Sequence, residues 1–245
     1  MIAELEPVLE NEPRPQPGDP TDRWRYMRSY MTLRALVGGM GLLLPLLLFL
    51  IDSRLFQETP DPRGSLSAYY YSGVRDLFVG ALCVTGAFLV TYKVAERNLD
   101  NTASIVAGLA ALVVALFPTG RPDDALGLTS VQRVFTEEWV ERIHFGSAAV
   151  FILSLGLVSV TFGIREGKRD PSDDQRRSPL FWRRFHIGCA GVIAAAVVFI
   201  AFSKLVVGPP GYLLIGEVAA VWAFGASWLM KGLELGVFRP RERAS

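Results

Sequence analysis

The stretch RALVGGMGLLLPLLLFLI (residues 34–51) carries a single charge, at its first residue, and is otherwise built from apolar residues, glycine and one proline. A helix that spans the roughly 30 Å hydrocarbon core of a bilayer needs about 20 predominantly apolar residues, and this stretch fits that requirement. Five similar runs follow, and the six predicted spans are 34–51, 73–92, 102–118, 143–164, 187–207 and 211–230. The runs are continuously apolar, which excludes the short alternating strands of a membrane barrel.

The composition of the whole chain leads to the same fold class. Hydrophobic residues make up 51% of the 245 residues and charged residues 20%, whereas soluble domains carry about a quarter charged residues. The formal net charge of +1 gives no reason to expect nucleic acid as a partner. Cys83 and Cys189 both lie inside apolar runs, so we expect no disulfide framework. The sequence therefore predicts an all-α polytopic membrane protein with six transmembrane helices.

The distribution of positive charge predicts the orientation of these helices. Seventeen Lys and Arg residues flank the spans on the side that holds both termini, against five in the odd-numbered loops, with Arg75 just inside the second span. Cytoplasmic loops of membrane proteins carry the excess of Lys and Arg. We therefore expect both termini in the cytoplasm.

The regions outside the spans differ in character. We expect a disordered, acidic, proline-rich tail at 1–20, an interfacial amphipathic helix at 21–33, a membrane domain at 34–232 and a basic cytoplasmic tail at 233–245. The helical spacing of Val131, Val134, Phe135 and Trp139 predicts an outer-surface helix over 131–142. Inside the third span, alanines recur at positions 103, 107, 111 and 115, which favours close helix packing.

Ionisable residues inside the spans are costly and each needs a role. With the predicted topology, Asp76, His144, Lys204 and Glu217 lie near the outer face. The small residues that share a helical face with Asp76 predict that this carboxylate points into the bundle. We expect Asp76 or Glu217 to pair with Arg75 or Lys204, because a buried charge without a partner is strongly unfavourable.

These residues have two interpretations. They are either structural ion pairs and caps, or the lining of an outer-facing polar pocket formed by Ser67, Tyr70, Asp76, His144 and Glu217. No equivalent cluster is expected near the cytoplasmic boundary, where His186 is interpreted as an interfacial residue. We expect no cofactor and no metal; the weaker alternative is a metal bound by His144, Asp76 and Glu217.

Three stretches resemble an uncharacterised family of bacterial six-span membrane proteins: SAYYYSGVRDLFVGALCVTGAFL (67–89), VALFPT (114–119) and AVWAFGASWLMKG (220–232). The resemblance implies a multi-pass protein of the bacterial cytoplasmic membrane. Relatives are expected to have a histidine where this chain has Tyr71. The architecture is also similar to DRAM/Sfk-type families. A more distant similarity is to membrane hydrolases related to alkaline ceramidases, whose roles only Ser67, Asp76 and His144 could fill here, since a histidine set in the last span is missing.

Three functions are compatible with these features. The first is a non-enzymatic protein that binds membrane lipid or a small ligand in the outer pocket, or acts as a subunit of a larger membrane complex. The second is a membrane-embedded lipid hydrolase, with or without a metal, whose catalytic residues the sequence does not identify. The third is a small-solute transporter, for which we expect polar groups through the whole bundle and an inverted repeat. Neither of these two features is evident in the sequence.

Overall fold

The computed structural model describes residues 20–56, 61–91, 99–122, 127–166, 179–206 and 211–234, and within these ranges every regular element is helical. In chain order the elements are α2 (Pro20–Ile51), the π-helix η1 (Asp52–Phe56), the 3₁₀-helix η2 (Ser67–Tyr71), α3 (Arg75–Thr91), α4 (Leu99–Leu116), α5 (Ser130–Phe135), α6 (Glu137–Glu166), α7 (Pro179–Leu205) and α8 (Tyr212–Glu234). Each of the six predicted apolar runs coincides with one long helix. The all-α fold class is therefore confirmed.

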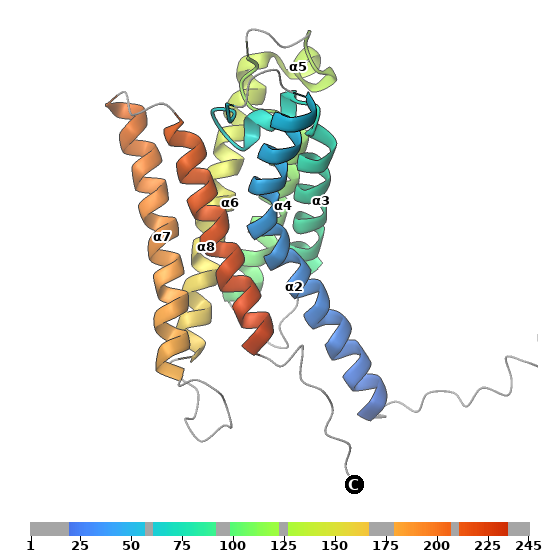
Figure 1. Ribbon diagram of the computed structural model, residues 1–245, viewed down its shortest axis with the longest axis vertical. Coiled ribbons are helices and arrows are strands. Elements are labelled where there is room, and N and C mark those ends of the chain that lie inside the picture. The colour runs from blue at the N-terminus through green and yellow to red at the C-terminus, as the bar shows by residue number, and fades with distance from the viewer. Residues whose placement is uncertain are drawn as a thin grey trace, which may run out of the picture.

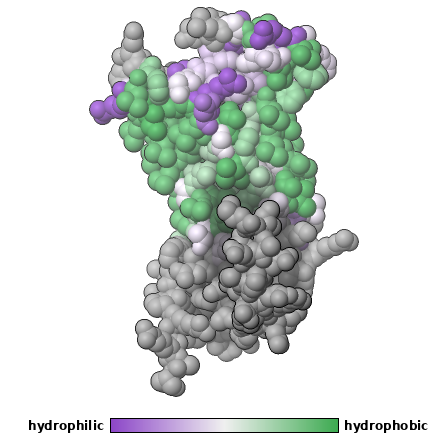
Figure 2. Space-filling view, turned by 90° about the vertical axis from the view of Figure 1, so that its right-hand side faces the viewer, coloured by the Kyte–Doolittle hydropathy of each residue, from purple (hydrophilic) through white to green (hydrophobic). Residues whose placement is uncertain are grey.

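Four of these helical segments are long and apolar enough to cross a membrane, namely Thr32–Phe56, Glu137–Glu166, Pro179–Leu205 and Tyr212–Lys231. The other two long helices are shorter: α3 has 17 residues, and the apolar part of α4 is Asn101–Leu116. The surface in Figure 2 is mainly hydrophobic over the middle of the bundle and hydrophilic at its upper end. This distribution is compatible with an integral membrane protein.

The long helices form a bundle in which α2 packs on α8, α8 on α7, α7 on α6, α6 on α4 and α4 on α3 (Figure 1). Helices α2 and α3 complete this ring but touch over a shorter stretch. The beginning of α2 and the end of α8 lie at the lower end of Figure 1, whereas η2 and α5 lie at the upper end. We use "lower end" and "upper end" in this sense below.

Small residues make the tightest contacts between these helices. A Cβ atom at Gly108 would lie 2.5 Å from the carbonyl oxygen of Gly86, and one at Gly225 would lie 2.9 Å from that of Gly38. The α3–α4 and α2–α8 pairs therefore approach with their backbones nearly in contact. The predicted alanine stripe of α4 is confirmed as a packing surface, because Ala103, Ala107, Ala111 and Ala115 are all buried.

Two predicted segments outside the spans can be compared with the structure. The segment 21–33 is helical and continues into the first span without a break, since α2 runs from Pro20 to Ile51, and its interfacial position stays a prediction. The helix expected at 131–142 is divided by Thr136, whose φ of 63° is uncommon for a β-branched residue and separates α5 from α6. Its predicted apolar face also points outward, with Val134 74% and Trp139 59% exposed.

Two further predictions fall largely outside the described residues. They are the tail predicted at 1–20, of which only the last residue is described, and the tail predicted at 233–245, of which only the first two are. Their predicted character therefore stays a prediction.

Candidate functional site

A cavity of about 90 Å³ lies inside the bundle, between α2, α3, α6 and α8, with one contribution from α4. Its walls are almost entirely apolar and come mainly from Leu, Val, Phe and Ala side chains. The polar side chains that line it are Ser67, Thr85 and Glu217. A mostly apolar cavity with a few polar groups is the usual form of a small-molecule binding site. We therefore take this cavity as the candidate site.

The upper end of the cavity is closed by the segment that leads into η2. The backbone N–H of Leu66 donates to Oε2 of Glu217 at 2.6 Å, and Ser67 lies beside the same carboxylate. The first N–H groups of a helix have no partner within the helix. Glu217, which is 8% exposed, supplies that partner from α8 and so joins η2 to the far side of the bundle.

Two other contacts hold this cap segment, which we define as residues 61–71. Arg63 donates through Nε to Oδ2 of Asp52 at 2.8 Å, and Asp52 is buried in the π-helix that continues α2. The N–H of Leu214 donates to the carbonyl oxygen of Gly64 at 3.1 Å. The cap segment is therefore fastened to α2 on one side and to α8 on the other.

Tyr71, at the end of the cap segment, connects it to the chain after α4. Its hydroxyl donates to the carbonyl oxygen of Thr119 at 2.9 Å and accepts from Nε2 of Gln132 at the same distance. Gln132 in turn forms a capping box with Thr129 at the start of α5. Burial raises the pKa of the Tyr71 phenol above its ordinary value of 10.0, so the hydroxyl stays protonated and able to donate at neutral pH.

The predicted outer pocket is only partly assembled. Ser67 and Glu217 line the cavity, but Tyr70, Asp76 and His144 do not. The Tyr70 hydroxyl accepts a hydrogen bond of 2.6 Å from Arg75. His144 is 1% exposed, and its Nδ1 lies 2.7 Å from the carbonyl oxygen of Phe117, to which it donates.

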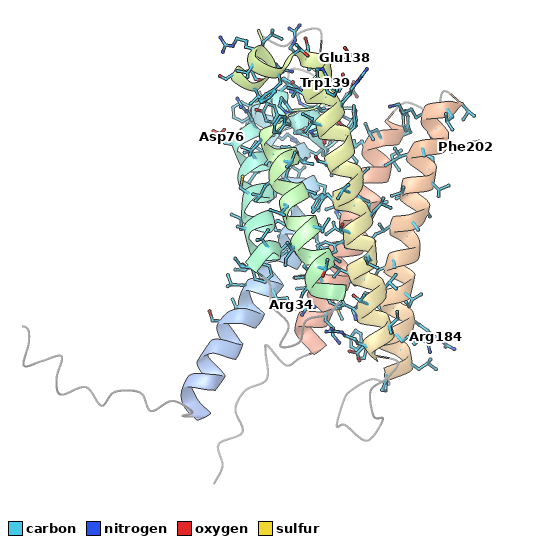
Figure 3. The ribbon with its side chains drawn as sticks, turned by 180° about the vertical axis from the view of Figure 1, so that it is seen from behind. Arg34, Asp76, Glu138, Trp139, Arg184 and Phe202 are labelled. Atoms are coloured by element: carbon cyan, nitrogen blue, oxygen red, sulfur yellow. The ribbon has the colours of Figure 1, made fainter. Side chains whose placement is uncertain are left out.

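The predicted inward orientation of Asp76 is wrong. Its side chain is exposed and points away from the bundle (Figure 3), and Gly80 and Ala87 on the same face are exposed too. The packed face of α3 mixes large and small residues and consists of Phe78, Ala81, Leu82, Gly86 and Leu89. Small residues therefore lie on both faces of α3, and their presence beside Asp76 did not indicate the direction of that face.

The predicted ion pairs are also wrong. Within the described residues, neither Asp76 nor Glu217 pairs with Arg75 or Lys204. Lys204 lies over the ring of Phe145, 5.3 Å from its centroid, and Arg75 lies over the ring of Tyr70. The backbone N–H of Leu66, in the cap segment, bonds to Glu217 in place of a cation. This contact could not be predicted from the sequence, because its partners are 151 positions apart.

The metal alternative receives no support from the described residues, in which no group of three His, Cys, Asp or Glu side chains could hold a metal ion. His144, Asp76 and Glu217 do not come together. His144 is engaged with a backbone carbonyl and Asp76 is on the outside of the bundle.

A second polar cluster, which the sequence analysis did not expect, lies at the lower end. Glu166 of α6 forms a buried ion pair with Lys231 of α8. The Arg34 guanidinium, 3% exposed, packs over two neighbouring rings, 4.7 Å from the centroid of Phe162 and 4.8 Å from that of Trp228. These charged residues stand at the ends of apolar runs, where the sequence favours an interpretation as membrane flanks.

His186 belongs to the same lower cluster, and its predicted interfacial position stays a prediction. The side chain is 0% exposed and its Nδ1 lies 2.9 Å from Oγ of Ser227. The ring also stacks on Trp182 within α7. The α7 helix begins at Pro179, eight residues before the predicted start of the span at 187, so His186 lies within the helix and faces α8.

Comparison of the chain with protein-family models, curated proteins and solved structures finds no match. The resemblance to a bacterial six-span family therefore stays a prediction. What the protein does is inferred below from the cavity and from the polar groups at its two ends.

Proposed function

We propose that the protein is a six-span protein of the bacterial cytoplasmic membrane, with both termini in the cytoplasm and the cap segment outside. The excess of Lys and Arg on the side of the termini supports this orientation. The positions of the beginning of α2 and the end of α8 at one end of the bundle are consistent with it (Figure 1). The 17 residues of α3 extend about 26 Å, which is close to the thickness of a bilayer core.

Cysteine labelling tests this topology. In a variant without Cys83 and Cys189, we expect a cysteine at Asp61 to react with an impermeant reagent only from outside. We expect a cysteine at Ser172 to react only from the cytoplasm. Labelling of both positions from the same side would contradict the six-span arrangement.

The function we propose is non-enzymatic binding of an aliphatic chain, from a lipid or another small membrane-soluble ligand, in the central cavity. The observation that carries this proposal is the apolar lining, which ends in Ser67 and Glu217. An enclosed apolar cavity of about 150 Å³ accepts benzene. The cavity of about 90 Å³ suits a narrow segment of one chain better than a ring system.

Specific contacts bear on the two alternative functions, hydrolysis and transport. Hydrolysis would need a nucleophile and a base within about 3 Å of each other, but Asp76 faces away from the bundle and His144 donates to Phe117. Transport is favoured by the lower cluster, because buried charges then occupy both ends of the bundle with the cavity between them. Uptake of solute by proteoliposomes, with no lipid retained in the purified protein, would favour transport over binding.

Filling the cavity tests the binding proposal. Ala148 lines the cavity from α6, whereas its neighbour Ala149 is exposed on the outside of the same helix. We expect native mass spectrometry of the wild-type protein to detect a retained single-chain or acyl-bearing lipid. Ala148→Leu should reduce its occupancy, and Ala149→Leu should leave it unchanged. Equal occupancy in all three proteins, or no retained lipid in any, would contradict the proposal.

A further inference from the structure

We infer that the ligand of the cavity carries a hydrogen-bond donor, a primary amine or a hydroxyl, at the end of its aliphatic chain, and that the carboxylate of Glu217 accepts it. This inference rests on the proposed function and adds the chemistry of the ligand's polar end. It follows from three features of the cavity's upper end: the charge of its lining, the unused capacity of the carboxylate and the positions of the neighbouring cations.

The lining has one ionisable side chain, Glu217, and among the described residues no Lys, Arg or His lines the cavity. The other polar side chains, Ser67 and Thr85, are neutral hydroxyls. A carboxylate attracts a cationic or donor group and repels another anion. Fatty acids and phosphate esters are therefore poorly matched to this cavity, whereas amines and alcohols match it.

The Glu217 carboxylate has room for one more donor. A carboxylate offers about four acceptor positions. The N–H of Leu66 uses one of them, and Ser67 lies beside the carboxylate. Because Glu217 itself lines the cavity, a donor at the end of a bound chain can reach an acceptor position that Leu66 does not use. The cap segment fixes the carboxylate in place before the ligand binds, which lowers the entropic cost of binding.

The cations nearest to this end of the bundle are engaged elsewhere. Arg63 pairs with Asp52, Arg75 with the hydroxyl and ring of Tyr70, and Lys204 with the ring of Phe145. None of them forms an ion pair with Glu217 within the described residues. The charge that complements Glu217 is therefore left to the ligand, and a charge-assisted bond from an amine is stronger than a neutral one from an alcohol.

Three probes with the same chain and different ends test this inference. The protein in nanodiscs of zwitterionic lipid is titrated at neutral pH with octylamine, 1-octanol or octanoic acid, and binding is measured as displacement of the retained lipid. We expect octylamine to bind about tenfold more tightly than octanoic acid, with 1-octanol between them. Ala149→Leu should keep this order, and Ala148→Leu should lose binding of all three probes, which separates the cavity from the bilayer.

Glu217→Gln isolates the contribution of the charge. This variant should bind octylamine only as tightly as 1-octanol, and its affinity for 1-octanol should change little. If Glu217→Gln does not fold, the order of the three probes on the wild-type protein and its loss in Ala148→Leu decide the question. Octanoic acid binding as tightly as octylamine would overturn the donor inference and leave the cavity proposal standing. Binding of none of the probes, with no retained lipid, would overturn both.

Discussion

The upper and lower ends of the helix bundle both bury polar side chains, but they satisfy them differently. At the upper end, Glu217 and His144 bond to backbone groups, and Asp52 pairs with Arg63 of the cap segment. At the lower end, side chains from three helices meet each other through the Glu166–Lys231 pair and the contacts of Arg34 with Phe162 and Trp228. The upper groups therefore hold a covering segment over the cavity, whereas the lower groups hold helices to one another.

The largest effect is expected at the lower end. Lys231→Met removes one partner of the buried Glu166–Lys231 ion pair, and such a loss costs about 3–5 kcal/mol. We expect a loss of this size in the free energy of unfolding, measured by titration with SDS. Lys204→Met is the matched control, because Lys204 is exposed and its contact with Phe145 is worth under about 1 kcal/mol. Equal losses in the free energy of unfolding of the two variants would contradict the proposed role of the buried pair at the lower end.

A smaller effect is expected where the cap segment meets α2. Asp52→Asn removes the charge that binds Arg63 and should cost about 1–3 kcal/mol of stability. We also expect faster proteolysis within residues 61–71, because the cap segment loses one of the contacts that hold it on the bundle. Asp61→Asn, on an exposed side chain, should change neither quantity. Unchanged proteolysis in Asp52→Asn would show that the pair does not hold the cap segment.

The smallest effect is expected at Tyr71. Tyr71→Phe removes the hydrogen bonds to Thr119 and Gln132 and should cost about 1 kcal/mol. Because burial raises the pKa of this phenol, its contribution to stability is complete below pH 10.0 and declines as the pH rises above that value. An absorbance titration should show that Tyr71→Phe lacks one late-titrating tyrosine. Loss of an early-titrating tyrosine instead would contradict the buried position.

The positions of the long helices could be predicted from the sequence, because the apolar runs are set by the thickness of a bilayer. The alanine stripe of α4 could be predicted as well, since close packing requires small residues at that spacing. The direction of Asp76 could not be predicted, because small residues lie on both faces of α3: Ala81 and Gly86 are buried, whereas Gly80 and Ala87 are exposed.

The polar contacts at the two ends of the bundle could not be predicted from the sequence for a different reason. Glu217 bonds to the backbone of Leu66, and any residue type except proline at position 66 would supply the same N–H. Arg34 and Lys231 are residue types that usually flank membrane spans. Their contacts, Arg34 with Phe162 and Lys231 with Glu166, arise from the packing of the helices. Glu217 was found as a candidate because ionisable groups in spans are rare, and Ser67 because its hydroxyl lies in the polar segment just before the second span.

The central claim is that the cavity between α2, α3, α6 and α8 holds an aliphatic chain. A high-resolution structure of the wild-type protein, purified in a mild detergent and reconstituted in nanodiscs without added ligand, tests it most directly. We predict continuous elongated density in the cavity, with one end within hydrogen-bonding distance of Glu217. A cavity closed by the surrounding side chains, or one that holds only separate water molecules, would contradict the claim.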